Sequence, residues 1–543
     1  MVAPSELPLN TNASAMQMAQ TIFGDGVTVV SASYTGDGRS SGIYSDGLGT
    51  MSGVAPSDTG VILSTGQAGD ITNSAGTGGG TGGGGWWNWW NPPTYTNSNQ
   101  DTNTSTNTSG PNGLSDFNQA AGAQTYDAAF IDANFIPTGD VMTMQFVFLS
   151  EEYPEYQTSL YQDFVGVWIN GVQVDLQVGD GDVDPRNLND TSNENLFVDN
   201  MSDQYNTEMD GFTVTMTLTI PVVSGQVNNI RIGIADVVDS NYDSNLMIAA
   251  NSVQTTLVAR HDQVTIAPDG TRTVDVLAND VNNTGGTLTI TKVNGQTVSV
   301  GSTVTLASGQ TVTVNADGTL TIDADSDIGG SNFTYTVTSS TGATDTGFVT
   351  VNQVPCFVAG TMIDTPDGPR AVHMLEPGDL VNTRDHGPQP VRWVGRRTVP
   401  AKGAFAPVRI RAGALGDHDT VMVSPQHRVL VQDVLAHLMF EEPEVLAAAR
   451  HLVNDHSIRV VEGGRVDYVH VLFDQHEIIT ANGLLSESFL PGPEITNIFA
   501  EETLSEITAL FPELDAATGE GYGPPARRVL KGYEAAAIRG RAA

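Results

Sequence analysis

The sequence contains a single cysteine, Cys356, which follows Pro355 at the point where a Thr-rich segment gives way to one of different composition. A lone cysteine cannot form an internal disulfide, which leaves packing, redox chemistry or nucleophilic attack as its roles. A thiol in this place can attack the carbonyl carbon of Pro355 and convert the Pro355–Cys356 amide into a thioester. Pro355 also restricts Val354 to extended backbone, which would present that carbonyl edge-on. The first chemistry that the sequence predicts is therefore self-cleavage at this bond.

An amide is a poor electrophile, so a thiol alone is not sufficient. Cleavage also requires a group that protonates the departing nitrogen and donors that hold the oxyanion. Nine of the ten histidines lie after residue 354, in the same part of the chain as Cys356. The downstream segment therefore contains candidates for the proton transfers.

Three blocks of this segment, in order, resemble the motifs of the Hint (Hedgehog/intein) domain. The first is Cys-Phe-Val-Ala-Gly-Thr at 356–361 with Met-Leu-Glu-Pro-Gly-Asp-Leu-Val at 374–381. The second is residues 421–430, which contain Ser424-Pro-Gln-His427, and the third is residues 468–483. Three blocks in sequence are far more specific than any one motif. The resemblance implies an all-β Hint domain.

The resemblance also implies roles for individual residues. Cys356 matches the nucleophile and His427 the histidine that acts on the scissile amide nitrogen. Ser424 stands where the family more often has Thr, and its hydroxyl can hold the amide or its oxyanion. His476 matches the histidine of the late block. His470 falls where many inteins carry Asp, which leaves open the group that deprotonates Cys356.

The expected reaction stops short of splicing. Inteins end in His-Asn before Cys, Ser or Thr, whereas Asn482-Gly483 is followed by Leu484 and matches an internal turn. The domain therefore resembles types that only cleave. We expect the thioester to be resolved by water, or by an amine or hydroxyl acceptor, without a cofactor.

Composition limits the partners and the location. The 62 acidic and 23 basic residues give a net charge of −39, which repels nucleic acid and anionic membranes. No apolar stretch approaches the ~18 residues that a membrane-spanning helix needs, and no N-terminal signal peptide is visible. We expect a bacterial protein that is secreted or held at the cell surface, with the basic C-terminal tail as an alternative export signal.

Alternating apolar and polar residues predict a mostly β chain of several domains. Residues 150–156 and 234–244 resemble the choice-of-anchor L domain of bacterial surface proteins, which implies a β-sandwich over 1–255 with a Gly/Trp/Asn-rich insertion at 76–113. Residues 256–353 resemble a cadherin-like or Ig-like sandwich. The Hint domain would cover 354–500, followed by a helical tail over 501–543. Helices are also expected over 13–23 and 442–453.

Aspartates crowd two stretches of the N-terminal region and predict a calcium site, because calcium takes six to eight oxygen ligands. The candidates are Asp180, Asp182, Asp184, Asp236, Asp239 and Asp243. The later positions of an EF-hand loop are missing, so that motif is excluded. A solvated acidic loop with Asx turns is the alternative. Glu151 and Glu152 beside Asp163 are a nonspecific signal for a glycosidase pair.

Four tryptophans at 86, 87, 89 and 90 lie in the insertion. They would either pack back onto a groove of the same domain or form a tip that binds carbohydrate or a cell surface.

The alternative to self-processing is a non-enzymatic adhesin or calcium-binding surface protein with an inactive Hint domain.

Overall fold

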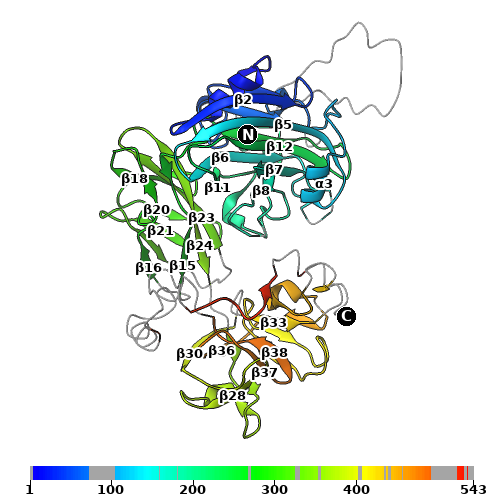
Figure 1. Ribbon diagram of the computed structural model, residues 1–543, viewed down its shortest axis with the longest axis vertical. Helices are drawn as coiled ribbons and strands as arrows, with labels where there is room; N and C mark the ends of the chain where they lie inside the picture. The colour runs from blue at the N-terminus through cyan, green and yellow to red at the C-terminus, as the bar shows by residue number, and fades with distance from the viewer. Residues whose placement is uncertain are drawn as a thin grey trace.

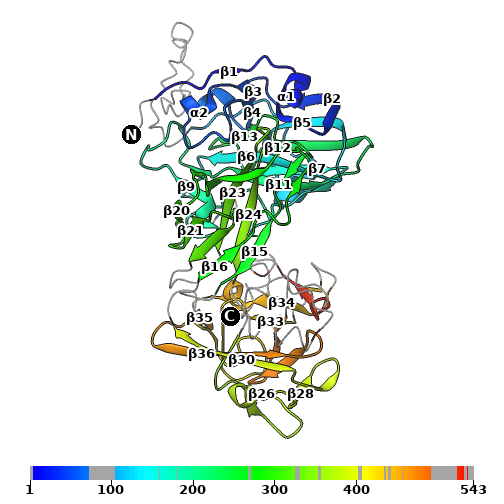
Figure 2. The ribbon, with the colours of Figure 1, turned by 90° about the vertical axis from the view of Figure 1, so that its left-hand side faces the viewer.

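The computed structural model describes residues 4–72, 104–157, 159, 161–179, 181–266, 271–323, 331–352, 356–401, 406–432, 436–437, 442–454, 456–490, 511, 522–530 and 535. Three β-rich units follow one another along the long axis of the molecule (Figures 1 and 2). The predicted mostly β fold class is confirmed.

The N-terminal unit is a sandwich of two antiparallel sheets. One has the order β1 (Leu9–Asn10), β3 (Ser41–Tyr44), β4 (Gly60–Ser64), β13 (Ser244–Ala249), β6 (Val141–Ser150), β10 (Gly211–Thr213), β9 (Phe197–Asp199), with β11 (Met216–Pro221) also paired to β6. The other has the order β2 (Val27–Thr35), β5 (Thr125–Pro137), β12 (Asn228–Val237), β7 (Phe164–Ile169), β8 (Val172–Gln173).

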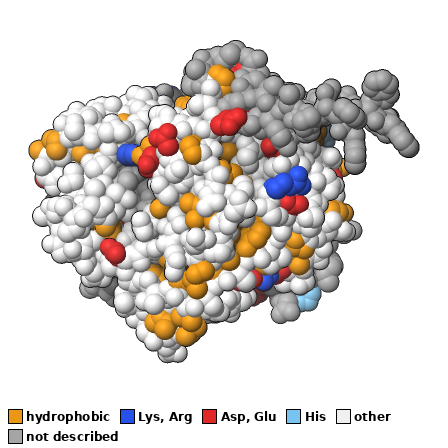
Figure 3. All heavy atoms as spheres, turned by 90° about the horizontal axis from the view of Figure 1, so that it is seen from above, with side chains coloured by type: hydrophobic (Ala, Val, Ile, Leu, Met, Phe, Trp, Pro, Cys, Tyr) orange, Lys and Arg blue, Asp and Glu red, His pale blue; other side chains and the backbone are white. Residues whose placement is uncertain are grey.

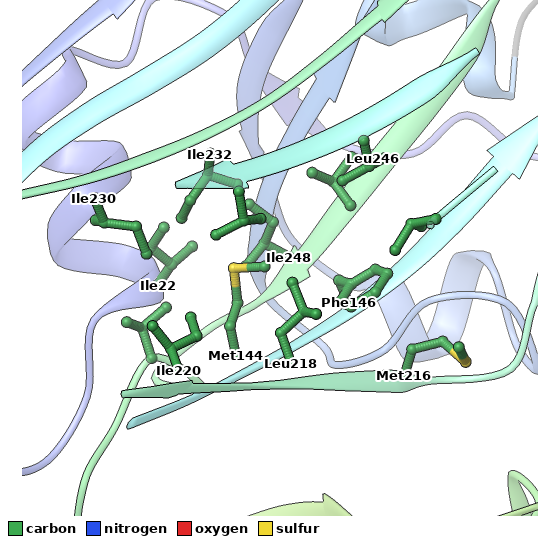
Figure 4. Packing of buried hydrophobic residues seen from close by; sticks show 14 of the residues in the cluster. Ile22, Met144, Phe146, Met216, Leu218, Ile220, Ile230, Ile232, Leu246 and Ile248 are labelled. Carbon is green, nitrogen blue, oxygen red and sulfur yellow. The ribbon is translucent and has the colours of Figure 1, made fainter. Parts of the chain in front are cut away.

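Apolar side chains from both sheets and from α1 (Ala15–Ile22) fill the sandwich, as Figure 4 shows. The helix begins at a capping box, in which Ser14 and Gln17 each bond the other's backbone N–H, and it buries Met18, Ala19 and Ile22. These two features confirm the helix expected over 13–23. The shorter helical elements are η1 (Ala68–Ile71), α2 (Gly47–Thr50), α3 (Ser115–Ala121) and η2 (Glu194–Leu196).

The middle unit is a second, smaller sandwich. Its sheets have the orders β15 (Asp262–Thr265), β24 (Thr344–Asn352), β23 (Ser331–Ser339), β18 (Leu288–Val293), β19 (Gln296–Thr297) and β16 (Thr271–Val274), β22 (Leu320–Asp323), β21 (Thr311–Val314), β20 (Thr303–Thr305), beside the pair β14 (Leu257–Val258) and β17 (Val281–Asn282). The turn at 315–318 joins β21 to β22, with Gly318 at a φ of 90°, as its Asn-Ala-Asp-Gly sequence predicts.

The first two units are docked on each other. Gln145 and Gln254 both donate from Nε2 to the Thr344 carbonyl, at 3.1 and 2.8 Å. Phe348 of β24 packs into the core cluster of the N-terminal sandwich. Hydrogen bonds that involve β24 therefore connect the end of the middle unit to the first.

The C-terminal unit contains two sheets around one apolar core. The first has the order β30 (Trp393–Pro400), β36 (Arg465–Leu472), β25 (Phe357–Val358), β32 (Val421–Val423), β31 (Val408–Ile410), β35 (Ile458–Val460). The second has the order β27 (Arg370–Ala371), β26 (Met362–Ile363), β37 (Ile478–Ala481), β38 (Leu484–Glu487), β33 (Arg428–Val431), β34 (Val445–Ala448), β39 (Arg528–Val529), with β28 (Leu380–Thr383) paired to β29 (Gly387–Pro390) and β37. The turns η3 (Val372–Met374) and η5 (Ala449–Leu452) complete the described elements of this unit.

Two expectations about helices in this unit are corrected. The segment 442–453 is strand β34 and the 3₁₀ turn η5, because Val445 to Ala448 pair with β33 in the core. In the tail, Arg528 and Val529 form a strand parallel to β34, and Leu530 and Ala535 join the core. The part of the tail that the structure describes therefore packs on the C-terminal unit. The remaining expectations for 501–543, and the four tryptophans, lie outside the described residues.

None of the described helices has the length and apolar character to cross a bilayer. Figure 3 looks onto the N-terminal unit, where small groups of hydrophobic side chains are scattered among backbone and other side-chain atoms, and the few basic side chains in view lie beside acidic ones.

Candidate active site

Cys356 is positioned by the short strand β25, which lies between two longer strands. Phe357 pairs with Val423 of β32 on one side and with Val469 of β36 on the other. The residue before Phe357 is therefore held between the end of β32, which leads into Ser424, and the part of β36 that carries His470. Cys356, Ser424 and His470 are all buried.

The backbone N–H and the backbone carbonyl of Cys356 both form hydrogen bonds with Ser424. The Cys356 N–H donates to Ser424 Oγ at 2.8 Å, and the Ser424 N–H donates to the Cys356 carbonyl at 2.9 Å. The Cys356 nitrogen belongs to the predicted scissile amide. Pro355, which contributes the carbonyl of that amide, lies outside the described residues.

The Cys356 thiol faces a histidine. Its Sγ lies 3.3 Å from His470 Nε2, within hydrogen-bond distance for sulfur. The His470 ring is oriented by stacking on Trp393 and by an edge contact with Phe489, at centroid distances of 6.5 and 5.6 Å. This histidine, which stands where many inteins carry Asp, is thus the imidazole beside the thiol. Tyr468 lies on the same strand, and burial, together with charge on Cys356, raises its pKa.

His427 is packed beside the same junction. Its ring lies 4.3 Å from the ring of Phe357, the residue after the cysteine. Neither ring nitrogen has a hydrogen-bond partner among the residues that the structure describes. Burial lowers the pKa of His427 to about 4, and the carboxylate of Glu487 opposes that effect only in part. The imidazole is therefore neutral at pH 7, and once protonated it would be a strong acid.

His476 occupies a different layer. Its Nδ1 accepts a hydrogen bond from the Ala526 N–H at 2.9 Å, and its Nε2 lies 3.3 Å from Glu487 Oε2. Glu487 also accepts from the Arg428 N–H and guanidinium, at 2.8 and 3.2 Å. Burial raises the pKa of the Glu487 carboxyl, but the charge of Arg428 and the hydrogen bond with His476 outweigh it and hold that pKa below its usual range. The contacts of His476 are thus with the tail and a buried ion network.

The structure therefore brings Cys356, Ser424, His470 and His427 to one junction. The sequence reasoning missed Glu487, Arg428 and the ring of Trp393. For Glu487 the sequence does offer a signal, because it is a single acidic residue in the otherwise mostly apolar strand segment Leu484-Leu-Ser-Glu487. A separate hollow of about 390 Å³ lies on the outer strands of the first sheet, lined by Arg409, Arg411, Thr420, His456 and Arg459.

The predicted calcium ligands do not come together as one set. Asp184 is buried, and its Oδ1 accepts the Asn187 N–H at 2.9 Å, which gives it a turn-stabilising role. Asp182 is partly exposed, Asp239 accepts the Asn241 N–H at 3.0 Å, and Asp180 lies outside the described residues. Asp236 and Asp243 are both buried elsewhere in the sandwich. Glu152 and Asp163 are also buried, so they do not face each other across a groove as a glycosidase pair would.

The lowered pKa of His427 predicts a loss of stability in acid. The folded chain binds a proton at this site only near pH 4, whereas an exposed histidine binds one near 6.5, so this contribution is complete above pH 6.5 and disappears as the pH falls to about 4. The expected loss is about 3 kcal/mol for the C-terminal unit. Denaturant unfolding at pH 7 and pH 4, with His427→Phe as a variant that cannot titrate, measures it. An equal loss in the variant would contradict the assignment to His427.

Comparison with known families gives three matches. A Choice-of-anchor L domain model matches residues 7–254, a Bacterial Ig domain model residues 253–352, and a Hint domain model residues 355–493. No curated protein matches the sequence. Among solved structures, the gp41-1 intein is 15% identical, with 25% of this chain and 98% of that chain covered and a TM-score of 0.17. A bacterial intein-like domain from Clostridium thermocellum is 18% identical, with 24% and 98% covered and a TM-score of 0.17.

Proposed function

We propose that this chain, in which a choice-of-anchor L domain, a bacterial Ig domain and a Hint domain follow one another, cleaves itself at Pro355–Cys356. The observation that carries the proposal is the double engagement of Cys356. Its thiol lies 3.3 Å from an imidazole while its amide N–H bonds the Ser424 hydroxyl. Nucleophile and leaving nitrogen are thus both held by polar groups inside a buried site.

In the first step, His470 Nε2 takes the proton of the Cys356 thiol and the sulfur attacks the Pro355 carbonyl carbon. The C–N bond of the tetrahedral intermediate then breaks, and the nitrogen must gain a proton to leave as an amine. The proton that His470 removed from the thiol is the one that the nitrogen gains, and His427, the second buried imidazole at the junction, relays it, because its low pKa makes its protonated form a strong donor. Ser424 holds the nitrogen in place. The product is a thioester between Pro355 and Cys356.

The second step resolves the thioester without splicing. Attack by water gives a carboxylate on Pro355 and regenerates the Cys356 thiol, whereas attack by an amine or hydroxyl attaches residues 1–355 to an acceptor. Asn482 does not support the cyclisation that splicing needs. It occupies a β-turn with Gly483, both at positive φ, and its side chain bonds the Met362 N–H and the Thr420 carbonyl.

The anchor and Ig domains suggest a surface protein. In this proposal the N-terminal sandwich and the Ig domain form the displayed part, which the Hint domain releases or transfers after export from a bacterium. The export route would read a signal other than an N-terminal signal peptide, with the basic tail as a candidate.

Intact mass measurement of the purified full-length chain tests this function. Added thiol should accelerate the appearance of a fragment that ends at Pro355. Hydroxylamine should convert that end to a hydroxamic acid, with the mass difference expected for NHOH in place of OH, because only an activated acyl group reacts in this way under mild conditions. A chain that keeps its intact mass with both reagents would leave the Hint domain as an inactive element of an adhesin.

A further inference from the structure

Buried carboxylates from distant parts of the sequence meet at one end of the N-terminal sandwich. In the sheet of β12 and β7, Ala235 pairs with Phe164, and the neighbouring carboxyl groups of Asp236 and Asp163 lie near enough to repel each other. In the other sheet, Asp243 directly precedes β13, and its carbonyl accepts the Glu151 N–H at 3.2 Å. We call the following residues, each between 1% and 3% exposed, the acidic cluster: Asp70, Asp127, Glu152, Asp163, Asp236 and Asp243.

The segment that begins at Thr104 ties part of this cluster together. The Thr106 N–H donates to Asp243 Oδ1 at 2.7 Å, and the Thr106 hydroxyl donates to Asp70 Oδ2 at 3.2 Å. The Thr104 carbonyl accepts the Asp243 N–H at 2.9 Å. Two carboxylates are therefore fixed at a short distance from each other by one threonine.

Several carboxylate oxygens of the acidic cluster accept no hydrogen bond from the described residues. Glu152 Oε2, Asp163 Oδ2, Asp236 Oδ1 and Asp243 Oδ2 have no hydrogen-bond partner among the described residues, and neither has the buried hydroxyl of Thr104. A buried polar atom without a partner is costly, and a buried charge without one is more so. Groups of this kind in a native fold require an explanation such as a bound ion.

The chain itself offers little positive charge here. Arg39, Arg186 and Arg231 are the only basic side chains among residues 1–255, which contain no lysine or histidine. Arg39 pairs with Asp37 at 3.1 Å and Arg231 pairs with Asp132 at 2.9 Å. Arg186 donates to a backbone carbonyl. The charge of Arg39 also acts on Asp70, so it is the remaining carboxylates of the cluster that would need a cation from solution.

Burial, with mutual repulsion, raises the pKa of Asp243 to about 7 and that of Glu152 to about 10, and it raises the pKa of Asp163 and Asp236 as well. Such groups stabilise the fold below the unfolded pKa near 4 and lose that contribution as the pH rises through their folded values.

We propose that the acidic cluster binds a calcium ion, with the carboxylates of Asp163, Asp236 and Asp243 as its principal ligands. Calcium takes six to eight oxygens in flexible geometry, and a site without sulfur or imidazole favours a hard cation. The ligands must turn towards the ion, since no group of three or more His, Cys, Asp or Glu in the described ranges is already arranged as a metal cage. This set keeps Asp236 and Asp243 from the sequence prediction and replaces the others.

Differential scanning calorimetry of the full-length chain tests the proposal, in the Cys356→Ala variant so that self-cleavage cannot interfere. After treatment with EDTA, addition of 1 mM calcium at pH 7.5 should raise the Tm of the N-terminal transition by about 5 °C or more. At pH 5 the rise should be smaller, because protons compete for the same oxygens. Sodium chloride at matched ionic strength is the control for screening.

Asp236→Asn separates the two explanations of the buried carboxylates. It should remove most of the calcium-dependent rise, and it should raise the Tm of the EDTA-treated protein at pH 7.5 because a neutral amide replaces a buried charge. Asp25→Asn, which changes an exposed carboxylate of the same domain, should leave the calcium effect unchanged. Asp243→Asn serves if the first variant does not fold.

Two results would overturn the proposal. One is an unchanged Tm with calcium together with an unchanged Tm on Asp236→Asn, which would assign the cluster to carboxyl groups that keep their protons. The other is an equal rise with sodium chloride. Isothermal titration of the folded, EDTA-treated protein with calcium gives an independent readout, and the absence of saturable binding would count against the site.

Discussion

The Cys356→Ala chain stays full-length under conditions in which the unchanged protein gives fragments of residues 1–355 and 356–543. The reason is chemical: without the sulfur no group on residue 356 can take the acyl group of Pro355, and a peptide bond is stable in water over the time of a preparation. Because the side chain is small and sits at the edge of β25, the loss of one sulfur leaves the strand pairing of Phe357 in place. The expected effect is complete loss of both fragments.

Mass spectrometry of the intact chain and gel electrophoresis measure this result after incubation with and without thiol. Cys356→Ser offers a graded control, because a hydroxyl can still form an ester, although more slowly. His456→Ala changes an exposed histidine of the same domain and should cleave as the unchanged protein does. Fragments of the same mass from Cys356→Ala would show that another group, or a contaminating protease, cuts the chain.

His470→Ala should slow thiol-dependent cleavage at pH 7 by a factor on the order of 10² to 10⁴, the usual contribution of a positioned base. His470 Nε2 is the nitrogen 3.3 Å from the sulfur, so its loss leaves the thiol to ionise by itself. A free thiol ionises near pH 8.5. The variant should therefore recover part of its rate at about pH 9, and a pH profile of the cleavage rate shows this.

His476→Ala is the matched comparison, because it removes a buried histidine of the same domain that contacts Glu487 and Ala526. It should lower stability by leaving Glu487 and the Ala526 N–H with one partner fewer, and any loss of rate should show no recovery at high pH. Identical profiles for the two variants, or an unchanged rate in His470→Ala, would contradict the assignment of the base to His470.

Much of the fold could be predicted because its elements are local patterns. The alternation over 141–148 matches β6, since every second residue from Met142 to Phe148 joins the sandwich core, and the other face of the strand is buried as well. The segment 442–453 shows the limit. Its Leu-Ala-Ala-Ala run has high helix propensity, but pairing of Val445 to Ala448 with β33 buries the same residues in a sheet. The helix propensity of a segment carries no information about a partner strand such as β33, which comes from another part of the sequence.

The sequence predicted which residues form the candidate site, but it did not predict which of them contact one another. Block order identified Cys356, Ser424, His427 and His470, but which histidine faces the sulfur depends on β25 lying between β32 and β36. The acidic residues show the same dependence on contacts. Asp184 stabilises a turn, whereas Asp163, Asp236 and Asp243 approach one another only through strand register and the packing of two sheets.

The docking of β24 limits what a released display region could join. This strand is paired on both sides, with β15 and β23, as far as Asn352, and its Phe348 is buried in the N-terminal sandwich. Only residues 353–355 separate it from the bond that would be cut, a tether of about 10 Å at full extension. An acceptor would therefore have to come almost to the surface of the Ig domain. This favours small amines, alcohols or water over a nucleophile that is attached to a large, rigid polymer.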